Sequence, residues 1–260
     1  MISALNESNE MVIASDVEKD GSIFRCSYCD EDTILKKGKK RIHHFSHKSD
    51  SGCEFSGGES QEHMKAKMEI YEKLSKHDNV EHCAVEYPFK KLGVRPDVIF
   101  STKNGTDVVI EIQKSNINIA TIERRMNRYR SKNINVIWIL LPTDKTTINA
   151  KGWQKYLHGM CYGKVYYWSE GAMVNPCHYI AEETWVEEYE DFKTGETVGG
   201  YSKILKNRKT LNFYGKSLHL VDDFRSKYKP RYKEYSEALV WLDNTRSWWP
   251  SEKTNSLDKR

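Results

Sequence analysis

The sequence of 260 residues contains no apolar run that approaches the roughly 20 residues a helix needs to span a bilayer. Its first residues lack both the basic segment and the long apolar segment of a secretory signal peptide. No internal repeat and no low-complexity segment is present. We therefore expect a cytoplasmic protein without a membrane partner.

Charge of one sign is also scarce, because the formal net charge is only +4. Nucleic-acid binding must therefore be argued from local clusters of basic residues. Because a cytoplasmic protein is expected, its six cysteines are more typical of free thiols or metal ligands than of disulfides. Cys83, Cys161 and Cys177 have no partner pattern and are predicted to be buried thiols.

Residues 1–57 are predicted to form a small β-rich module, with strand-like runs near residues 11–14, 22–25 and 33–36. A Cys-x-x-Cys pair is followed by closely spaced histidines and one more cysteine, a spacing typical of a tetrahedral structural zinc site. The predicted zinc ligands are Cys26, Cys29, His47 and Cys53. His44 is the alternative fourth ligand, and His47 is favoured because it lies closer to Cys53. Reduced cysteines beside unrelated histidines are the competing interpretation.

The next part of the chain is predicted to have the order α-β-β-β-α-β. A helix capped by Ser60 continues to about residue 75, and a strand follows at 81–89. Val98–Phe100 and Val108–Ile112 are apolar runs on either side of an Asn-Gly turn, which predicts a hairpin. A second helix is expected at 115–131 and a buried strand at 135–141.

Polar side chains interrupt the predicted hairpin. A three-residue loop centred on Asn104 places Asp97 opposite Glu111, and Gln113 shares a strand face with Glu111. Two carboxylates that lie so close repel each other unless a cation lies between them, and such oxygen ligands suit Mg²⁺ or Mn²⁺. An ordinary surface hairpin with scattered polar residues is the alternative.

The first predicted helix adds further candidates. Glu62 lies in its first turn and can contribute a metal ligand directly or through water, although an acidic residue there also suits the helix dipole. Lys67 lies one turn beyond His63 and can supply a positive charge. Catalytic residues are therefore predicted to be Glu62, Asp97, Glu111 and Gln113.

The second predicted helix is basic, since residues 114–132 hold six basic residues and one acidic residue. We predict contacts with nucleic acid from Arg124, Arg125, Arg128 and Tyr129. A solvated helix face is the alternative interpretation.

Taken together, these motifs resemble two known patterns. Asp97 with Glu111-Ile-Gln113 resembles the PD-(D/E)XK nuclease signature, with Gln in place of the final Lys. The wider set resembles the competence protein CoiA-like nuclease family. Its residues are Cys26-x-x-Cys29, Ile34-Leu-Lys-Lys-Gly-Lys, His44-Phe-Ser-His47, Glu59-Ser-x-Glu62-His63, Arg95-Pro-Asp97, Glu111-Ile-Gln113, Arg125-x-x-x-Tyr129 and Val136-Ile-Trp-Ile-Leu.

The resemblance implies an α/β (α+β) protein with a zinc-binding module at 1–57, a PD-(D/E)XK nuclease-like domain at 58–145 and a mixed C-terminal accessory region at 146–260. It also implies a metal-dependent DNA endonuclease or nickase with structural zinc and catalytic Mg²⁺ or Mn²⁺, acting in natural transformation or in phage and defence settings with recombination or defence partners. Gln is the usual residue at position 113 in that family, yet it cannot supply positive charge or act as a general base. A non-catalytic nucleic-acid-binding protein is the main alternative function, and RNA is an alternative substrate.

The C-terminal region is less informative. We expect a helix near 153–158 and an exposed edge strand at 163–168. Six acidic residues at 172–192 predict a segment that avoids DNA. Residues 224–235 alternate aromatic and basic side chains, which favours an amphipathic helix over a single-strand contact.

Overall fold

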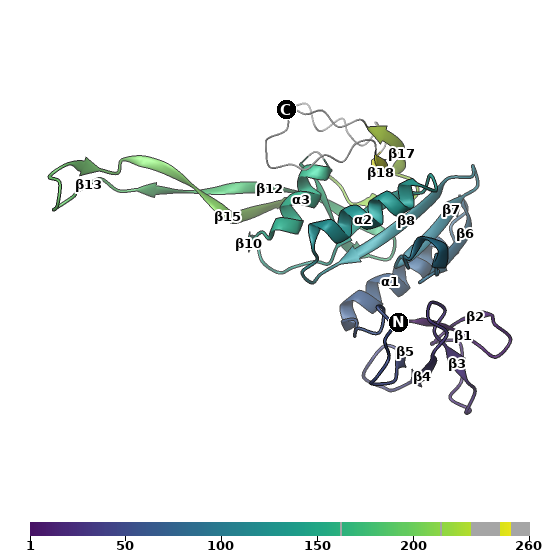
Figure 1. Cartoon of the computed structure of the whole chain (residues 1–260). Coiled ribbons are helices and arrows are strands. Elements are labelled where there is room, and N and C mark those ends of the chain that lie inside the picture. The colour runs from purple at the N-terminus through teal and green to yellow at the C-terminus, as the bar shows by residue number, and fades with distance from the viewer. Residues whose placement is uncertain (162, 214, 230–244, 251–260) are drawn as a thin grey trace.

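The N-terminal module is a five-stranded antiparallel sheet in the order β2-β1-β3-β4-β5 (Figure 1). The computed structural model describes residues 1–161, 163–213, 215–229 and 245–250. The strands of the module are β1 Ser3–Leu5, β2 Met11–Ile13, β3 Phe24–Arg25, β4 Asp32–Lys36 and β5 His44–His47. The predicted β-rich character is confirmed, and β1 and β5 add to the strands that the sequence predicts.

The second body contains an 11-stranded sheet whose main path runs β10-β15-β12-β11-β9-β8-β7-β6. Its helices are α1 Gln61–Leu74, α2 Ile119–Arg130 and α3 Gly152–Met160, with a 3-10 helix η1 at Lys90–Leu92. Its first strands are β6 Val80–Val85, β7 Val98–Thr102, β8 Asp107–Gln113 and β9 Asn135–Leu140. The later strands are β10 Thr147–Asn149, β11 Val165–Glu170, β12 Met173–Val186, β13 Tyr189–Glu190, β14 Thr197–Val198, β15 Tyr201–Phe213, β16 Leu218–His219, β17 Phe224–Lys229 and β18 Thr245–Pro250.

The predicted order of elements is confirmed, because α1, β6, β7, β8, α2 and β9 follow one another along the chain. The Ser60 hydroxyl caps α1 by accepting a hydrogen bond from the His63 amide at 3.2 Å. The hairpin pairs Val98 with Ile110, the register that the three-residue loop predicts. Strand β9 then joins β8 in parallel, as expected for a crossover through α2.

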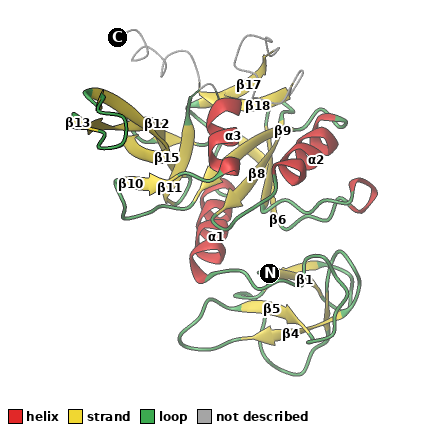
Figure 2. Ribbon diagram, turned by 60° about the vertical axis from the view of Figure 1, so that its left-hand side comes forward, coloured by secondary structure: helices red, strands yellow, loops and turns green. Residues whose placement is uncertain are grey.

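The helices cover both faces of this sheet (Figure 2). Met64, Ile70 and Leu74 of α1 pack on one face, where Phe100 and Ile110 point inward. The opposite face carries α2 and α3, whose apolar side chains pack on residues of β8, β9 and β11. Strand β9 is buried along its whole length because both of its faces are covered, and this explains its continuous apolar sequence.

The region after residue 145 continues the same sheet. Strand β11 lies between β9 and β12, and Val165–Trp168 are buried. The expectation of an exposed edge strand here is therefore wrong, since β12 pairs with its outer side. The helix near 153–158 is confirmed as α3, whereas Phe224–Lys229 form a strand instead of the expected amphipathic helix. Residues 230–235 of that expectation lie outside the described residues.

None of the described helices has both the length and the apolar character that a membrane crossing requires.

Removing a buried side chain from the α1 face of the sheet tests this core. Ile110→Ala should lower the free energy of unfolding by about 2–5 kcal/mol, since Ile110 is fully buried and the change leaves a cavity. Ile23→Ala, at an exposed isoleucine, is the control and should change it by less than about 0.5 kcal/mol. Chemical denaturation measures both values, and equal effects would contradict this packing.

Candidate functional site: a Cys3His cluster and a buried ionic cavity

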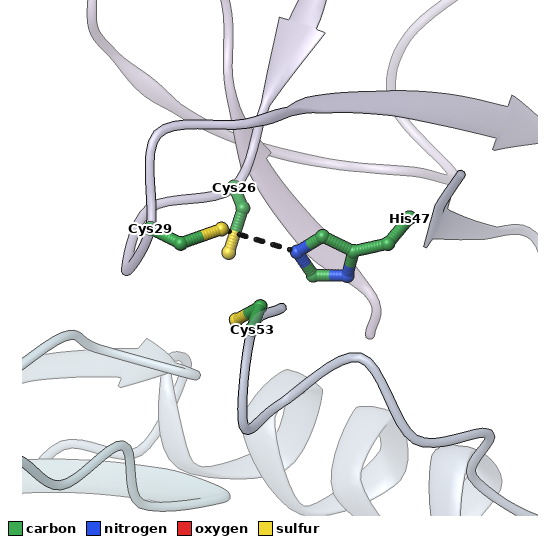
Figure 3. A group of neighbouring side chains, drawn as sticks. All are labelled: Cys26, Cys29, His47 and Cys53. Atoms are coloured by element: carbon green, nitrogen blue, oxygen red, sulfur yellow. Dashed lines mark hydrogen bonds between the residues drawn. The ribbon is translucent and has the colours of Figure 1, made fainter. Parts of the chain in front are cut away.

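The N-terminal module brings its four predicted zinc ligands together (Figure 3). Cys26 follows β3, Cys29 lies in the turn beyond it, His47 ends β5 and Cys53 lies in the loop that leaves the sheet. One ligand atom from each residue lies within 4.8 Å of the others, and the cysteines are free thiols. Three sulfurs and one imidazole nitrogen form the donor set of a tetrahedral structural zinc site, so the cluster can hold a zinc ion.

The same geometry separates the two candidate histidines. His47 Nε2 lies 3.4 Å from Cys29 Sγ, whereas His44 Nδ1 lies against the Ile42 carbonyl oxygen at 2.8 Å. Burial and the neighbouring Cys53 and Cys26 raise the pKa of the Cys29 thiol to about 12. The Cys29 side chain is therefore a neutral thiol at neutral pH, and a bound zinc ion would take the cysteines as thiolates with release of their protons.

A cavity of about 520 Å³ lies where the N-terminal module meets α1 and the end of β8. The loop after Cys53 forms one wall with Phe55, Gly57 and Gly58. Polar side chains supply much of the remaining lining, namely Glu59, His63, Lys67, Glu86, Arg95, Asp97, Gln113, Lys114 and Arg125. The cavity is therefore shared by the two parts of the chain.

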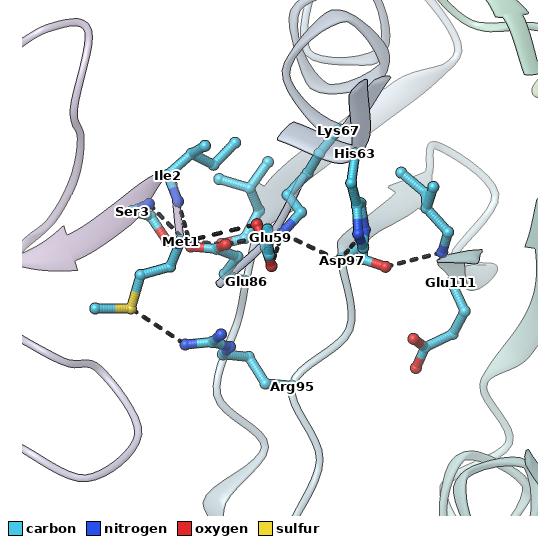
Figure 4. Close-up of polar contacts among 12 residues, drawn as sticks. Met1, Ile2, Ser3, Glu59, His63, Lys67, Glu86, Arg95, Asp97 and Glu111 are labelled. Atoms are coloured by element: carbon cyan, nitrogen blue, oxygen red, sulfur yellow. Dashed lines mark hydrogen bonds and ion pairs between the residues drawn. The ribbon is translucent and has the colours of Figure 1, made fainter. Parts of the chain in front are cut away.

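Asp97 lies at the end of this cavity, directly before β7 (Figure 4). Its Oδ2 accepts a hydrogen bond from the Ile112 amide at 2.8 Å, which fixes the carboxylate against β8. Its Oδ1 lies 3.0 Å from His63 Nε2 and 3.1 Å from Lys67 Nζ. Burial alone raises the pKa of Asp97, but the charges of His63 and Lys67 outweigh that effect and hold the pKa well below its usual range.

Lys67 links three carboxylates. Its side chain is only 1% exposed, and Nζ lies 2.7 Å from Glu59 and 2.8 Å from Glu86 in addition to Asp97. Burial disfavours the charged form, yet the three carboxylates raise the pKa of Lys67 above its usual range. The lysine is thus a permanent cation that cannot accept a proton at neutral pH.

Glu86 connects this network to the N-terminal module. Its second carboxylate oxygen accepts hydrogen bonds from the amides of Ile2 and Ser3 and from the Ser3 hydroxyl, each at 2.9 Å. Its backbone has φ of 52°, in the left-handed region that non-glycine residues rarely adopt. The position of β1 and the position of Lys67 are therefore set by the same buried carboxylate.

Glu111 has partners of its own on the opposite helix. It is 1% exposed, and its two oxygens lie 2.7 Å from Arg125 and 2.6 Å from the Tyr129 hydroxyl of α2. Burial raises its pKa, and Arg125 opposes that effect. The structure therefore directs Asp97 toward α1 and Glu111 toward α2, so their repulsion is relieved by side chains of the protein itself. Asp97 nevertheless lies close enough for its charge to raise the pKa of Glu111, and a metal ion shared by the two carboxylates stays a prediction.

Two other predicted catalytic residues lie at different depths. Gln113 lines the cavity and its side-chain amide donates to the Ser115 carbonyl oxygen at 2.7 Å. Glu62 has a side chain that is 61% exposed, lies 3.3 Å from Lys114 and is not among the residues that line the cavity. In its place Glu59, three residues earlier, points toward Lys67.

Two of the four arginines of α2 have partners inside the protein, and the other two are exposed. Arg125 contacts Glu111, and Arg128 donates a hydrogen bond to the Gly93 carbonyl oxygen at 2.5 Å. Tyr129 is fully buried, so a contact with nucleic acid does not fit its place in the structure. Among the four predicted contacts, Arg124 is the exposed one.

A second group of potential metal ligands lies in the cavity. Atoms of Glu59, His63 and Asp97 lie within 4.8 Å of one another. Glu59 Oε2 accepts no hydrogen bond but lies 3.9 Å from the Met1 ammonium group, and His63 Nε2 lies 3.0 Å from Asp97 Oδ1. Two carboxylates and an imidazole are a donor set that can hold a divalent cation. The sequence predicted Glu62 as the ligand and gave Glu59 only as part of the family motif. Glu59 precedes the Ser60 cap of α1, whereas His63 and Lys67, four residues apart, share a face of that helix.

His77, His219 and Asp222 form a third such group, where α1 meets the segment around β16. Its atoms are already paired, because His77 and His219 both lie near one Asp222 oxygen, at 3.1 and 3.3 Å. Backbone amides also donate to the Nδ1 atoms of both imidazoles. The group serves to hold two segments together.

The zinc assignment can be tested with the two neighbouring histidines. Wild-type protein should contain about one zinc per chain, and His47→Ala should lose it because a tetrahedral site needs all four ligands. His44→Ala is the matched control and should retain the metal. Elemental analysis measures both, and zinc loss from the His44 variant alone would reverse the assignment.

The buried lysine can be tested through stability. Lys67→Met should lower the free energy of unfolding by about 3–5 kcal/mol, because three buried carboxylates lose their shared cation. Lys65→Met, on the exposed face of the same helix, should change it by less than about 0.5 kcal/mol. Urea denaturation compares the two, and similar values would show that the network contributes little.

Comparison with known protein families gives two matches. Residues 8–56 match the N-terminal domain of competence protein CoiA, and residues 59–164 match its nuclease-like domain. Neither the curated proteins nor the solved structures contain a match to this chain. The first match contains the whole Cys3His cluster, and the second contains Glu59, Lys67 and Asp97. With both domains present in this order, the chain belongs to the competence protein CoiA family.

Proposed function

We propose that this protein is a metal-dependent nuclease that hydrolyses phosphodiester bonds in DNA as an endonuclease or nickase. The main support is the buried group of Glu59, His63 and Asp97 at the cavity between the two parts of the chain. The nuclease-like domain that residues 59–164 match provides the reaction class.

The group around Lys67 offers oxygen ligands to a cation. Three carboxylates surround the Lys67 ammonium group, and the Met1 ammonium group lies 3.9 Å from Glu59. Asp97 and Glu59 raise the pKa of His63 against the effect of burial, so a metal ion at this place would replace the proton of His63. Carboxylates suit Mg²⁺ and Mn²⁺, and an imidazole ligand favours Mn²⁺ of the two. We propose Asp97, Glu59 and His63 as the residues that hold the ion. When bound, such an ion lowers the pKa of a coordinated water and neutralises charge on the phosphate.

The other residues of the cavity then have distinct roles. Lys67 holds the carboxylates of Glu59 and Asp97 in position, and its raised pKa excludes it as a general base. Gln113 can orient water by donating and accepting hydrogen bonds, but it cannot take a proton.

Glu111 is a third carboxylate in the proposed site. It is held by Arg125, and Arg125 lines the cavity. A guanidinium group binds phosphate in a bidentate geometry, so a phosphate in the cavity competes with Glu111 for Arg125. Release of Arg125 would make the Glu111 carboxylate available beside Asp97. Lys114 at the cavity wall and exposed Arg124 add positive charge for the DNA backbone.

Cleavage assays with Mg²⁺ or Mn²⁺ on single-stranded, duplex and supercoiled DNA test the proposal. Asp97→Asn and Glu59→Gln should each lower the cleavage rate by at least about 100-fold, since direct ligands are lost. Glu62→Gln removes an exposed carboxylate from the same end of α1 and should keep the rate within about fivefold. All three variants should still bind DNA in an anisotropy assay. Equal losses in the Glu59 and Glu62 variants would refute this ligand set.

A non-catalytic nucleic-acid-binding protein is the second candidate. It is favoured by the fact that Lys67 already neutralises Glu59 and Asp97, while Gln113 adds no charge. Wild-type protein that binds DNA, cuts no form of DNA or RNA with either ion, and shows no calorimetric metal binding dependent on Asp97 would support this candidate.

A further inference from the structure

A long two-stranded arm projects from the sheet (Figure 1). It consists of the outer parts of β12 and β15, which pair from Glu182–Leu205 to Val186–Tyr201, and of the short strands β13 and β14 beyond them. Strand β10 pairs with β15 only at residues 208–210. Within the described residues, the outer strands of the arm therefore pair only with each other.

Both faces of this arm present apolar side chains to solvent. Directly opposed residues share a face, so Trp185 and Ile204 lie on one face, whereas Val186, Tyr201 and Leu205 lie on the other. Trp185 and Ile204 are each 58% exposed, and Phe192 near the turn is fully exposed. An isolated two-stranded ribbon is at best marginally stable in water, and exposed apolar clusters mark interaction sites.

The arm is also charged differently along its length. Its tip, residues 187–196, contains five acidic residues and one lysine. Its stem, residues 180–186 and 201–209, contains four basic residues and two acidic ones. The basic residues all lie on β15, and they are Lys203, Lys206, Arg208 and Lys209. Trp185 on one face and Tyr201 on the other lie where stem and tip meet.

We infer that this arm is a homodimerisation device that binds the arm of a second copy of the chain in antiparallel orientation. Such an arrangement places each acidic tip against the basic stem of the other copy, and a two-fold axis satisfies both contacts at once. The apolar residues at the stem–tip boundary then meet near the axis. A parallel arrangement would oppose like charges, and the acidic tip does not suit a polyanion such as DNA.

This inference does not depend on nuclease activity, and it concerns residues beyond the two family matches, which end at residue 164.

Matched isoleucines test the contact. Sedimentation equilibrium of the full chain should find a wild-type dimer, and Ile204→Ser should raise its dissociation constant at least about tenfold. Ile23→Ser is the control, because Ile23 is 57% exposed on the N-terminal module, and it should leave the constant unchanged. Circular dichroism confirms that both variants fold. A wild-type monomer at every concentration, or equal effects of both substitutions, would overturn the inference.

Charge exchange tests the orientation. Lys203→Glu with Lys206→Glu, and separately Glu187→Lys with Glu188→Lys, should each weaken the dimer and make it less sensitive to added salt. All four substitutions in one chain reverse the charges on both sides of the stem–tip boundary, so opposite charges face each other there again and the dimer should recover above either pair alone. Failure of the combined variant to recover above either pair alone would overturn the antiparallel arrangement.

Discussion

The buried ammonium group of Lys67 is the interaction on which the candidate site depends. It joins Glu59 before α1, Asp97 before β7 and Glu86 after β6, three carboxylates that would otherwise repel one another in the interior. Burying these charges has a large desolvation cost, which only close pairing offsets. The same ion pairs therefore stabilise both the network and the shape of the cavity. A change in one partner is expected to displace the others.

This network explains why the N-terminal module belongs to the site and is more than an appended domain. One contact is the hydrogen bonding of β1 amides to Glu86, and another is the loop after Cys53, where Arg95 stacks over the Phe55 ring at 4.5 Å. Because Cys53 belongs to the Cys3His cluster, the fold of that loop is linked to the state of the cluster. The loop after Cys53 therefore connects the Cys3His cluster directly to the cavity wall.

Features that depend on neighbouring residues in the chain were predicted correctly from the sequence. The Asn104-Gly105 turn and the flanking apolar runs gave the correct hairpin register, and Ser60 caps its helix as expected. Partners from distant segments were not predictable in this way. Glu86 directly follows β6, and nothing in the neighbouring sequence marks it as a buried residue. It becomes a buried acceptor only because the amides of Ile2 and Ser3, more than 80 residues away in the chain, donate hydrogen bonds to it. Likewise Tyr129 was predicted to contact nucleic acid from an exposed helix face. In the structure its hydroxyl is buried, because it donates a hydrogen bond to the buried carboxylate of Glu111. Val165–Trp168 lie in an inner strand and not in an edge strand, because a later strand, β12, pairs with their free side.

The cavity wall and the tip of the arm differ in the charge that they carry. The cavity wall holds Lys114 and Arg125, whereas the arm tip, residues 187–196, holds five acidic residues and one lysine. Placing negative charge on a projection that lies outside the nuclease-like domain keeps its repulsion of a polyanion away from the cavity, since screening at physiological salt limits its range to about 8 Å. Strands β11 and β12 supply the rigid connection that keeps this separation, because they are hydrogen-bonded continuously to β9 and thereby to β8. The same sheet therefore positions the candidate site at one end and carries the arm, which we propose as an assembly surface, at the other (Figure 1).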